Sequence, residues 1–204
     1  MDKASRKRAE IIEAAYKVIC EKGYHATRIE DIAAETGMAQ GLFYHYFRNK
    51  LDIITQILDE VIRGITQGIA ADAPAASNTL EEYEAQLRRA VDKLFDRFVE
   101  DPLLSRLLFY EALGIDEEIN HKLQAAFDLF GDYSASYMRN GIQKGFLRPD
   151  MRIKETAFAF NAVVFEGARR ISLSGNKEQT RRHWTNAIVD LMIRGTAGPG
   201  LLPR

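Results

Sequence analysis

Apolar residues recur along most of this chain at steps of three and four, which places them on one face of an α-helix. The clearest run extends from Leu51 to Ile69, and a second run keeps this spacing from Leu80 to Phe98. No segment shows the alternation of apolar and polar residues that is typical of a half-buried β-strand. We therefore predict an all-α fold of about nine helices, over residues 6–22, 27–36, 39–47, 51–69, 79–101, 102–113, 117–144, 153–174 and 178–194.

Capping and turn residues mark several of these helix boundaries. Thr27 is followed three residues later by Glu30, the spacing of a capping box, in which each side chain accepts from a free backbone N–H at the start of a helix. Gly37 follows the next apolar run and suits the left-handed conformation that often ends a helix. Asn49 and Thr79 can cap the helices that come after them.

Two short helices joined by a glycine turn are thus predicted between Thr27 and Phe47. In the second helix we expect Leu42 and Phe43 to face inward, as do Tyr46 and Phe47 by their spacing. The residues expected to stay accessible are Gln40, Gly41, Tyr44 and His45. A chain with this arrangement can place one short helix in the major groove of DNA.

This segment resembles the DNA-binding domain of the TetR family of transcriptional repressors. The resemblance covers residues 5 to about 60, and beyond them it extends only to the pattern of helix lengths. It implies a three-helix DNA-binding domain in residues 1–50 and a larger helical domain, for effector binding and dimerisation, in residues 51–204. Ala39 departs from the family, in which many members carry serine or threonine at this position. The residues that carry the resemblance are Gly23, Tyr24, Thr27, Ile29, Ile32, Ala33, Gly37, the run from Gly41 to Phe47, Lys50 and Leu51.

The resemblance also implies a homodimer that binds a palindromic operator on double-stranded DNA. Two reading helices would then enter successive major grooves roughly 34–36 Å apart. We expect Ala39, Gln40 and Gly41 to lie against base edges, because a glutamine amide pairs with adenine and an alanine methyl contacts the thymine methyl. Arg28 could contact either bases or phosphates, and packing between helices is the alternative for Tyr44 and His45. The expected phosphate contacts are Thr27, Tyr44, His45 and Lys50.

The segment from Ala157 to Phe165 is apolar around the whole helix, which indicates burial on both sides. Together with the helix over residues 178–194 it suits a four-helix interface between two copies of the chain. The alternative is a helix at the centre of a monomeric core. The residues expected at the interface are Ala157, Val164, Ala168, Trp184, Ile188 and Leu191.

The larger domain is expected to hold a pocket for a small hydrophobic effector, because an apolar cavity with a few polar groups is the usual small-molecule site. Fatty acids, their thioesters and hydrophobic drugs are the ligands that the family suggests. An aromatic stripe at helical spacing also forms ordinary core, and this alternative stays open for each candidate. The candidates are Arg106, Phe109, Tyr110, Phe127, Phe130, Tyr137, Asn161 and Phe165, with Glu111, Glu166 and Arg169 as further polar anchors.

Composition agrees with a soluble, cytoplasmic protein. The 204 residues are 46% hydrophobic and 28% charged, which is ordinary for a globular domain. Residues 1–50 hold nine Lys or Arg against seven Asp or Glu, while the whole chain has a net charge of −1. No run approaches the roughly 18 apolar residues of a membrane span, and the charged N-terminus lacks the apolar stretch of a signal peptide. The single Cys20 excludes an internal disulfide and fits a reducing compartment.

An enzyme is not indicated. The sequence contains none of the glycine-rich nucleotide motifs, the nucleophile elbow or the H-E-x-x-H zinc motif. Its four histidines are scattered without metal-ligand spacing. We therefore expect no catalytic residues, no metal site and no cofactor. The alternative function, a helical small-molecule-binding or interaction module without sequence-specific DNA binding, leaves the pattern between Thr27 and Lys50 unexplained.

Overall fold

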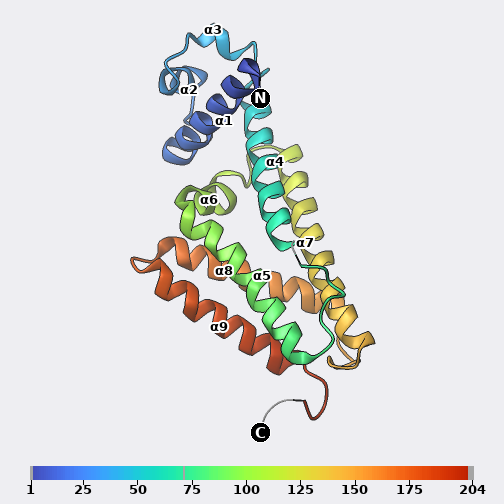
Figure 1. Ribbon diagram of the computed structural model, residues 1–204. Coiled ribbons are helices and arrows are strands. Elements are labelled where there is room, and N and C mark those ends of the chain that lie inside the picture. The colour runs from blue at the N-terminus through green and yellow to red at the C-terminus, as the bar shows by residue number, and fades with distance from the viewer. Residues whose placement is uncertain (1, 71, 202–204) are drawn as a thin grey trace. The chain divides into compact units, whose positions relative to one another are not determined.

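The computed structural model describes residues 2–70 and 72–201, and in these residues all regular elements are helical (Figure 1). The predicted all-α class and the predicted number of helices are confirmed. A π-helical segment, Leu107–Glu111, continues α6. The nine α-helices are α1 (Lys3–Lys22), α2 (Ile29–Glu35), α3 (Gln40–Phe43), α4 (Lys50–Ile69), α5 (Leu80–Glu100), α6 (Pro102–Arg106), α7 (Glu117–Gln143), α8 (Ile153–Leu173) and α9 (Lys177–Thr196).

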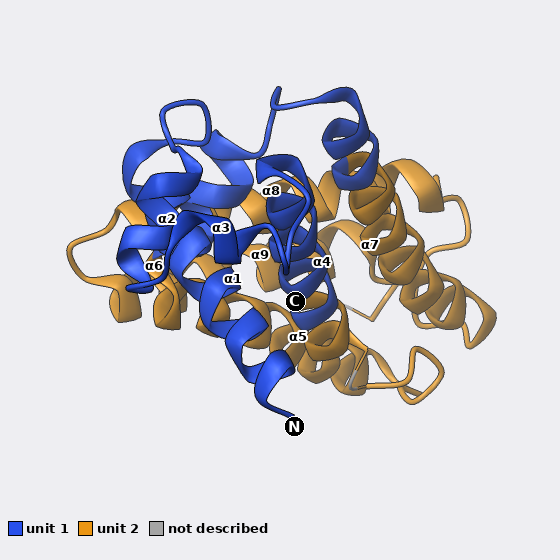
Figure 2. Cartoon of the chain, turned by 90° about the horizontal axis from the view of Figure 1, so that it is seen from above, with its two compact units in different colours: residues 1–64, 103–123 blue, residues 65–102, 124–204 orange. Residues whose placement is uncertain are grey.

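The chain forms two compact units (Figure 2). The first unit contains residues 1–64 and 103–123, and the second contains residues 65–102 and 124–204. The predicted boundary at residue 50 marks the end of the three-helix segment α1–α3, whereas the packing division falls within α4. Residue 1 and residues 202–204, the outer ends of the two predicted domains, lie outside the described residues.

The core of the first three helices is apolar, and it confirms most of the inward positions. Ile32 and Ala33 are buried, and the buried rings of Phe43 and Phe47 lie 5.5 Å apart. The prediction for Leu42 is wrong, because its side chain is 40% exposed. The predicted helix over residues 39–47 ends at Phe43 and continues as a turn. This turn keeps only residues 43 and 47, four apart, on the inner face.

The capping predictions are confirmed at two helices and wrong at a third. The Asn49 side chain accepts from the Asp52 N–H at 2.8 Å, and the Thr79 hydroxyl accepts from the Glu82 N–H at 3.2 Å. At α2 the cap residue is Arg28, whose N–H donates to the Asp31 carboxylate at 2.8 Å. The predicted box was one residue early because the Thr27 hydroxyl donates instead to the Gly23 carbonyl, at 2.8 Å.

In the second unit α5, α8 and α9 pack against one another (Figure 1). Gly167 permits the close approach of these helices. A Cβ atom at this position would lie 2.7 Å from the Phe95 ring of α5 and 3.1 Å from the Trp184 ring of α9. The small residues of α8 therefore serve contacts within the chain, in addition to any contact with a second copy.

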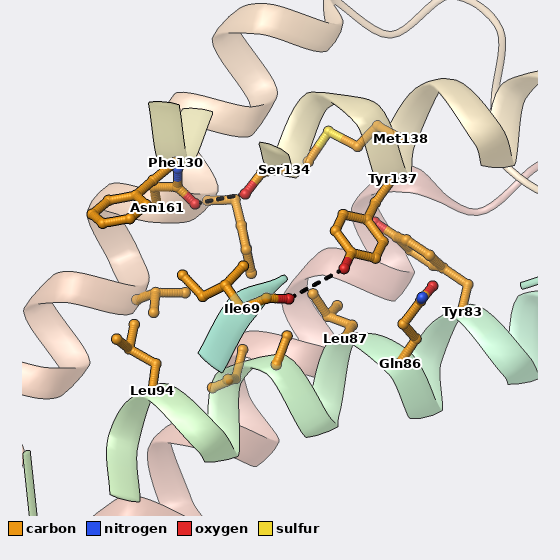
Figure 3. Close-up of a pocket in the computed structure, with 14 residues that line it drawn as sticks. Ile69, Tyr83, Gln86, Leu87, Leu94, Phe130, Ser134, Tyr137, Met138 and Asn161 are labelled. Atoms are coloured by element: carbon orange, nitrogen blue, oxygen red, sulfur yellow. Dashed lines mark hydrogen bonds between the residues drawn. The ribbon is translucent and has the colours of Figure 1, made fainter. Parts of the chain in front are cut away.

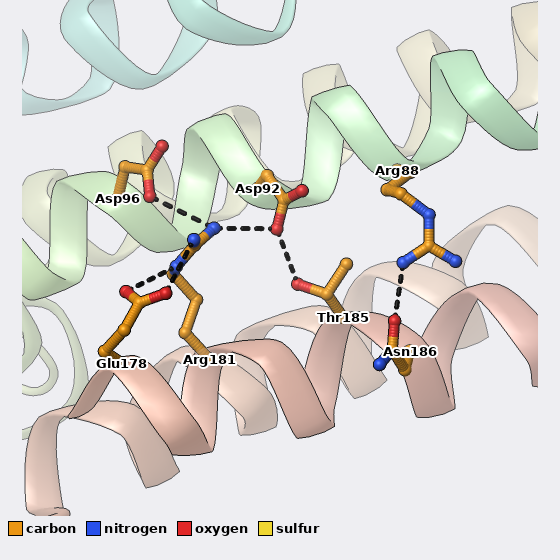
Figure 4. A network of polar contacts seen from close by, with 7 residues as sticks. All are labelled: Arg88, Asp92, Asp96, Glu178, Arg181, Thr185 and Asn186. Carbon is orange, nitrogen blue, oxygen red and sulfur yellow. Dashed lines mark hydrogen bonds and ion pairs between the residues drawn. The ribbon is translucent and has the colours of Figure 1, made fainter. Parts of the chain in front are cut away.

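A polar network ties α5 to α9 (Figure 4). The Arg181 guanidinium lies 2.9 Å from Asp92, 3.3 Å from Asp96 and 3.0 Å from Glu178. Asp92 also accepts from the Thr185 hydroxyl at 2.8 Å. The hydrogen bond to Glu178 and the neighbouring carboxylates raise the pKa of Arg181 above its ordinary value. One half-buried arginine thus pairs with three carboxylates at once.

Replacing Arg181 with alanine should lower the free energy of unfolding by about 1–3 kcal/mol, because Asp92 loses its charged partner in a half-buried position. Urea denaturation followed by circular dichroism measures this change. The matched control is Arg182→Ala, which removes an exposed neighbouring charge and should stay within about 0.5 kcal/mol. Equal effects of the two substitutions would contradict the role assigned to the network.

Candidate nucleic-acid interface and ligand pocket

Three residues predicted to lie against DNA bases and two predicted to contact phosphates lie on an accessible surface of α3 and its flanking residues. Ala39, Gln40, Gly41, Tyr44 and His45 are all exposed, and we call these five residues the reading face. The Tyr44 side chain is 53% exposed, so packing between helices does not account for it.

Gln40 has a partner that the sequence analysis missed. Its Nε2 donates to the Glu30 carboxylate at 2.8 Å, between two exposed side chains. To pair with adenine through both amide atoms, Gln40 has to exchange this bond for one to the base. The partner could not be found from sequence, because the two residues are ten positions apart on different helices.

The start of α3 lacks a side-chain cap. Ala39 is the cap residue, with extended backbone angles and no side-chain oxygen to accept from the first free N–H groups. This is the position at which the sequence departs from the TetR pattern. The burial of Phe43 anchors this short helix to the core.

An Ala39→Ser substitution should raise the free energy of unfolding by about 0.5–2 kcal/mol, because serine supplies the missing cap acceptor. The check is thermal unfolding, compared with Ala39→Val, whose side chain offers no acceptor. An increase shared by both variants, or absent from the serine variant, would contradict the assignment of Ala39 as an uncapped helix start.

Lys50 anchors the loop that leads into α2. Its ammonium donates to the carbonyl oxygens of Tyr24 and Thr27, the latter at 2.8 Å, and lies 4.3 Å from the centre of the Tyr24 ring. Burial lowers the pKa of this amine below its ordinary value. Thr27 is 2% exposed, with its hydroxyl used by Gly23. Both residues were expected to contact phosphate, but the structure instead places their polar atoms on neighbouring carbonyl groups.

The same loop is held from the π-helical segment. The Glu111 carboxylate accepts from the Tyr24 N–H at 3.0 Å and pairs with Arg106 at 3.3 Å. Gly23, with a φ of 89°, leaves room for it, because a Cβ there would lie 3.3 Å from the carboxylate. Loop 23–27 is thus fixed by one acidic and one basic side chain.

Several residues predicted for the effector site lie elsewhere. Arg106, Phe109, Tyr110 and Glu111 belong to the first unit and do not line the pocket described below. The helical spacing of the aromatic residues could not show which unit they join. Glu166 also lies outside the lining, and hydrogen bonds from Arg169 and Arg170 lower its pKa to about 2. The polar anchors predicted from charge are therefore ion pairs.

A pocket in the second unit is lined by α5, α7, α8 and the end of α4 (Figure 3). Three predicted residues, Phe130, Tyr137 and Asn161, are among the fourteen that line it. Phe127 and Phe165 lie outside the lining, and their rings pack edge to face at 5.2 Å. The cavity volume is ≈ 60 Å³, well below the roughly 300–1,000 Å³ of drug-sized sites. A larger ligand must therefore displace lining side chains.

The pocket wall is mainly apolar, with five polar side chains: Tyr83, Gln86, Ser134, Tyr137 and Asn161. The Tyr137 hydroxyl donates to the Asp72 carbonyl, and burial raises its pKa to about 12. The Ser134 hydroxyl donates to Asn161 Oδ1 at 2.8 Å. Gln86, which the sequence analysis missed, donates from Nε2 to the Ala73 carbonyl at 2.9 Å. Its signal in the sequence was a single amide within the apolar stripe of residues 80–98.

Two polar atoms at this pocket have no hydrogen-bond partner within the described part of the chain. They are Gln86 Oε1 and Asn161 Nδ2, both of which are buried. Buried polar atoms of folded proteins nearly always have a partner, so each exception needs an explanation. The pair marks the pocket as a place where further hydrogen bonds can form.

Four of the six residues predicted at a dimer interface are buried inside the subunit. Ala157, Ala168 and Ile188 pack within the second unit, and Val164 lines the pocket. They are buried because α8 meets α5 and α9 of its own chain. Leu191, by contrast, is 59% exposed, and Trp184 is half-buried. The exposed sides of α8 and α9 also carry Ala159, Ala162 and Ala187, so a small-residue surface remains available.

The described residues contain neither a candidate metal cluster nor a helix that could span a membrane. No group of three or more histidine, cysteine, aspartate or glutamate side chains there could hold a metal ion. None of the helices in residues 2–70 and 72–201 is long and apolar enough to cross a membrane.

Known proteins share the sequence features of this chain. Residues 11–57 match the family model described as bacterial regulatory proteins, tetR family. The fatty acid metabolism regulator protein of Bacillus subtilis is 25% identical over 186 residues, which cover 91% of this chain and 93% of that protein. The transcriptional repressor NicS of Pseudomonas putida is 26% identical over 201 residues, covering 94% and 93% of the two chains.

Solved structures share its fold. FadR from Bacillus subtilis in complex with stearoyl-CoA gives a TM-score of 0.74 at 22% identity, over 92% of this chain and 98% of that one. SmeT, the repressor of the Stenotrophomonas maltophilia multidrug efflux pump SmeDEF, gives 0.74 at 21% identity, over 96% and 93%. The family match over residues 11–57 and the relatives over most of the chain identify a DNA-binding transcriptional regulator, in agreement with the exposed helix-turn-helix. The chain belongs to the TetR family of these regulators, as its resemblance indicated.

Proposed function

We propose that this protein is a transcriptional repressor that binds a palindromic operator as a homodimer and releases it when a small hydrophobic effector occupies the pocket. The observation that carries the proposal is the course of α4. This helix begins at Lys50, which anchors loop 23–27, and ends at Ile69, which lines the pocket. The single helix α4 therefore connects the pocket to the loop that precedes the helix-turn-helix. We propose that ligand binding changes the position of the reading helix through α4.

The reading face supplies the proposed DNA contacts. Gln40 reads a base edge, with Ala39 and Gly41 allowing close approach of the backbone. Tyr44 and His45 hold phosphates, and the exposed Arg28 contacts either group. Thr27 and Lys50 act indirectly, by fixing the loop that orients α2, because their polar atoms already have partners.

The homodimer is proposed on the exposed sides of α8 and α9. Ala159, Ala162 and Ala187 are small enough to let a second copy approach closely, and Leu191 supplies apolar area. A two-fold interface of this kind brings the same patch of each copy together. It also provides the two heads that a palindromic site requires.

The cellular setting follows from this role. A protein that regulates transcription from bacterial DNA works in the cytoplasm, and its single cysteine, Cys20, is buried. The relatives are regulators of transcription, and we propose no enzymatic activity.

Native mass spectrometry of the purified protein can identify co-purifying ligands, which are then added to a complex with selected operator DNA. We expect the bound ligand to weaken operator binding at least about tenfold. A complete switch from 1:99 to 99:1 requires about 5.5 kcal/mol of differential affinity. An operator affinity that no pocket ligand changes would contradict the regulatory part of the proposal.

A further inference from the structure

The wall of the pocket carries no charge. Each of the fourteen side chains that line it is apolar, a hydroxyl or an amide. Arg89 and Asp72, charged residues in the same unit, pair with each other at 3.0 Å and do not belong to the lining. A ligand inside the pocket therefore meets no Lys or Arg side chain that could neutralise an acidic group.

The medium inside the pocket also disfavours charge. Burial raises the pKa of Tyr137 to about 12 and raises that of Tyr83 above its ordinary value. The same loss of hydration acts on any anion that enters. An ionised carboxylate without a paired cation has a large desolvation penalty in such surroundings. Fatty acids and phosphate-bearing thioesters are consequently poor candidates.

The two unpaired atoms define what a ligand must carry. Gln86 Oε1 can only accept a hydrogen bond and Asn161 Nδ2 can only donate one. Gln86 is 1% exposed, so bulk water does not reach it. Figure 3 shows the two amides toward opposite ends of the pocket, on α5 and α8. Each unpaired buried atom carries a desolvation penalty, which a matching ligand group removes.

We infer that the effector is an uncharged, largely apolar molecule with a hydrogen-bond donor for Gln86 at one end and an acceptor for Asn161 at the other. This inference rests on the proposed function in taking the pocket as the effector site. It assigns this chain a ligand class different from the stearoyl-CoA bound in the structure of FadR. Met138 and Phe130 also line the pocket. A methionine side chain is flexible, so this wall can adapt to ligands of different length.

The test uses the full chain and ligands matched in length. The probes are 1,8-octanediol, octanoate and octanoyl-CoA at pH 7.5, followed by thermal unfolding and by calorimetric titration. Each hydroxyl of the diol both donates and accepts, so either end can meet either amide. The diol should raise the melting temperature in a saturable way, and the two anionic ligands should raise it much less at equal concentration.

Two variants connect the binding to the unpaired atoms. Gln86→Met and Asn161→Leu should each weaken diol binding roughly tenfold, the equivalent of one lost hydrogen bond. Each substitution also removes a formed hydrogen bond, from Gln86 to the Ala73 carbonyl or from Ser134 to Asn161. The ligand-free melting temperature of each variant is therefore measured first, and diol affinity is compared by calorimetric titration below it. Gln124→Met, at an exposed glutamine of α7 outside the lining, is the control and should bind the diol like the parent protein.

Three results would overturn the inference: no saturable diol binding, octanoate or octanoyl-CoA binding at least as tightly as the diol, or diol affinity in both amide variants equal to that of the parent protein. Operator binding without any ligand is measured separately. If the ligand-free protein binds no operator but binds the diol, the proposed repressor function is refuted and the inferred ligand class is retained. Intact operator binding with a preference for anions would refute only the ligand class.

Discussion

Replacing Leu191 with glutamate should convert the protein into monomers and weaken operator binding by roughly 10²–10⁴-fold, the range by which two linked sites exceed one. Leu191 is 59% exposed on α9. A two-fold interface contains the substitution twice, once in each subunit. Each new carboxylate would then be buried against the second copy, without a positive partner. Because Leu191 packs little within its own subunit, the helical content and melting of the monomer should change little.

Analytical ultracentrifugation measures the mass of this variant, and fluorescence anisotropy measures its affinity for DNA. The control is Leu129→Glu, which places the same charge at an exposed leucine of α7 and should leave both mass and affinity unchanged. A Leu191→Glu protein that sediments as a dimer would refute the proposed interface. Val164 is not a suitable probe, because it lines the pocket inside the subunit.

A Lys50→Ala substitution should lower the free energy of unfolding by about 1.5–3 kcal/mol, the range for hydrogen bonds to a charged group. It removes an ammonium that binds two backbone carbonyls and lies against the Tyr24 ring. Operator affinity should fall for all sequences, because loop 23–27 no longer orients α2.

The salt dependence of DNA binding separates this role from a direct phosphate contact. A lost phosphate contact reduces the slope of log K against log salt by about 0.9. For Lys50→Ala we expect an unchanged slope. The comparison is Arg28→Ala, which removes an exposed and permanently charged side chain beside the reading face. If Arg28 contacts a phosphate, this substitution should reduce the slope. A slope reduced by about one unit in Lys50→Ala, with stability unchanged, would place Lys50 on the DNA.

Helical spacing predicted the fold well because almost every helix of this chain buries one apolar face. The errors arose where a short element depends on distant groups. Thr27 and Glu30 have the spacing of a capping box, but the Thr27 hydroxyl donates to the carbonyl of Gly23. Leu42 was placed inward on the assumption of a longer helix, whereas α3 has four residues. Neither outcome follows from local propensity, because both depend on how the loop and the turn pack.

The sites divide in the same way. The exposed reading face was predictable from the spacing of polar and apolar positions within one short segment. The pocket was not, because aromatic residues at helical spacing do not show whether they face a cavity, a core or another unit. Phe109 and Phe130 had the same signal, yet only Phe130 lines the pocket. The apolar helix around Val164 was expected to be buried on both sides, but Ala159 and Ala162 are exposed. Its buried side packs against α5 and α9 of its own chain.

Selection of binding sites from random duplex DNA, run in parallel for the parent protein and for Gln40→Ala, tests whether the reading face recognises a specific operator sequence. For the parent protein we predict a palindromic consensus with half-site centres about 10 base pairs, or one helical turn, apart. In Gln40→Ala the preference should relax at one equivalent position of both half-sites, at a cost of about 1–3 kcal/mol in discrimination. A repressor that reads DNA through Gln40 would be contradicted if the parent protein enriched no sequence. The same would follow if the parent protein and Gln40→Ala enriched the same consensus sequence.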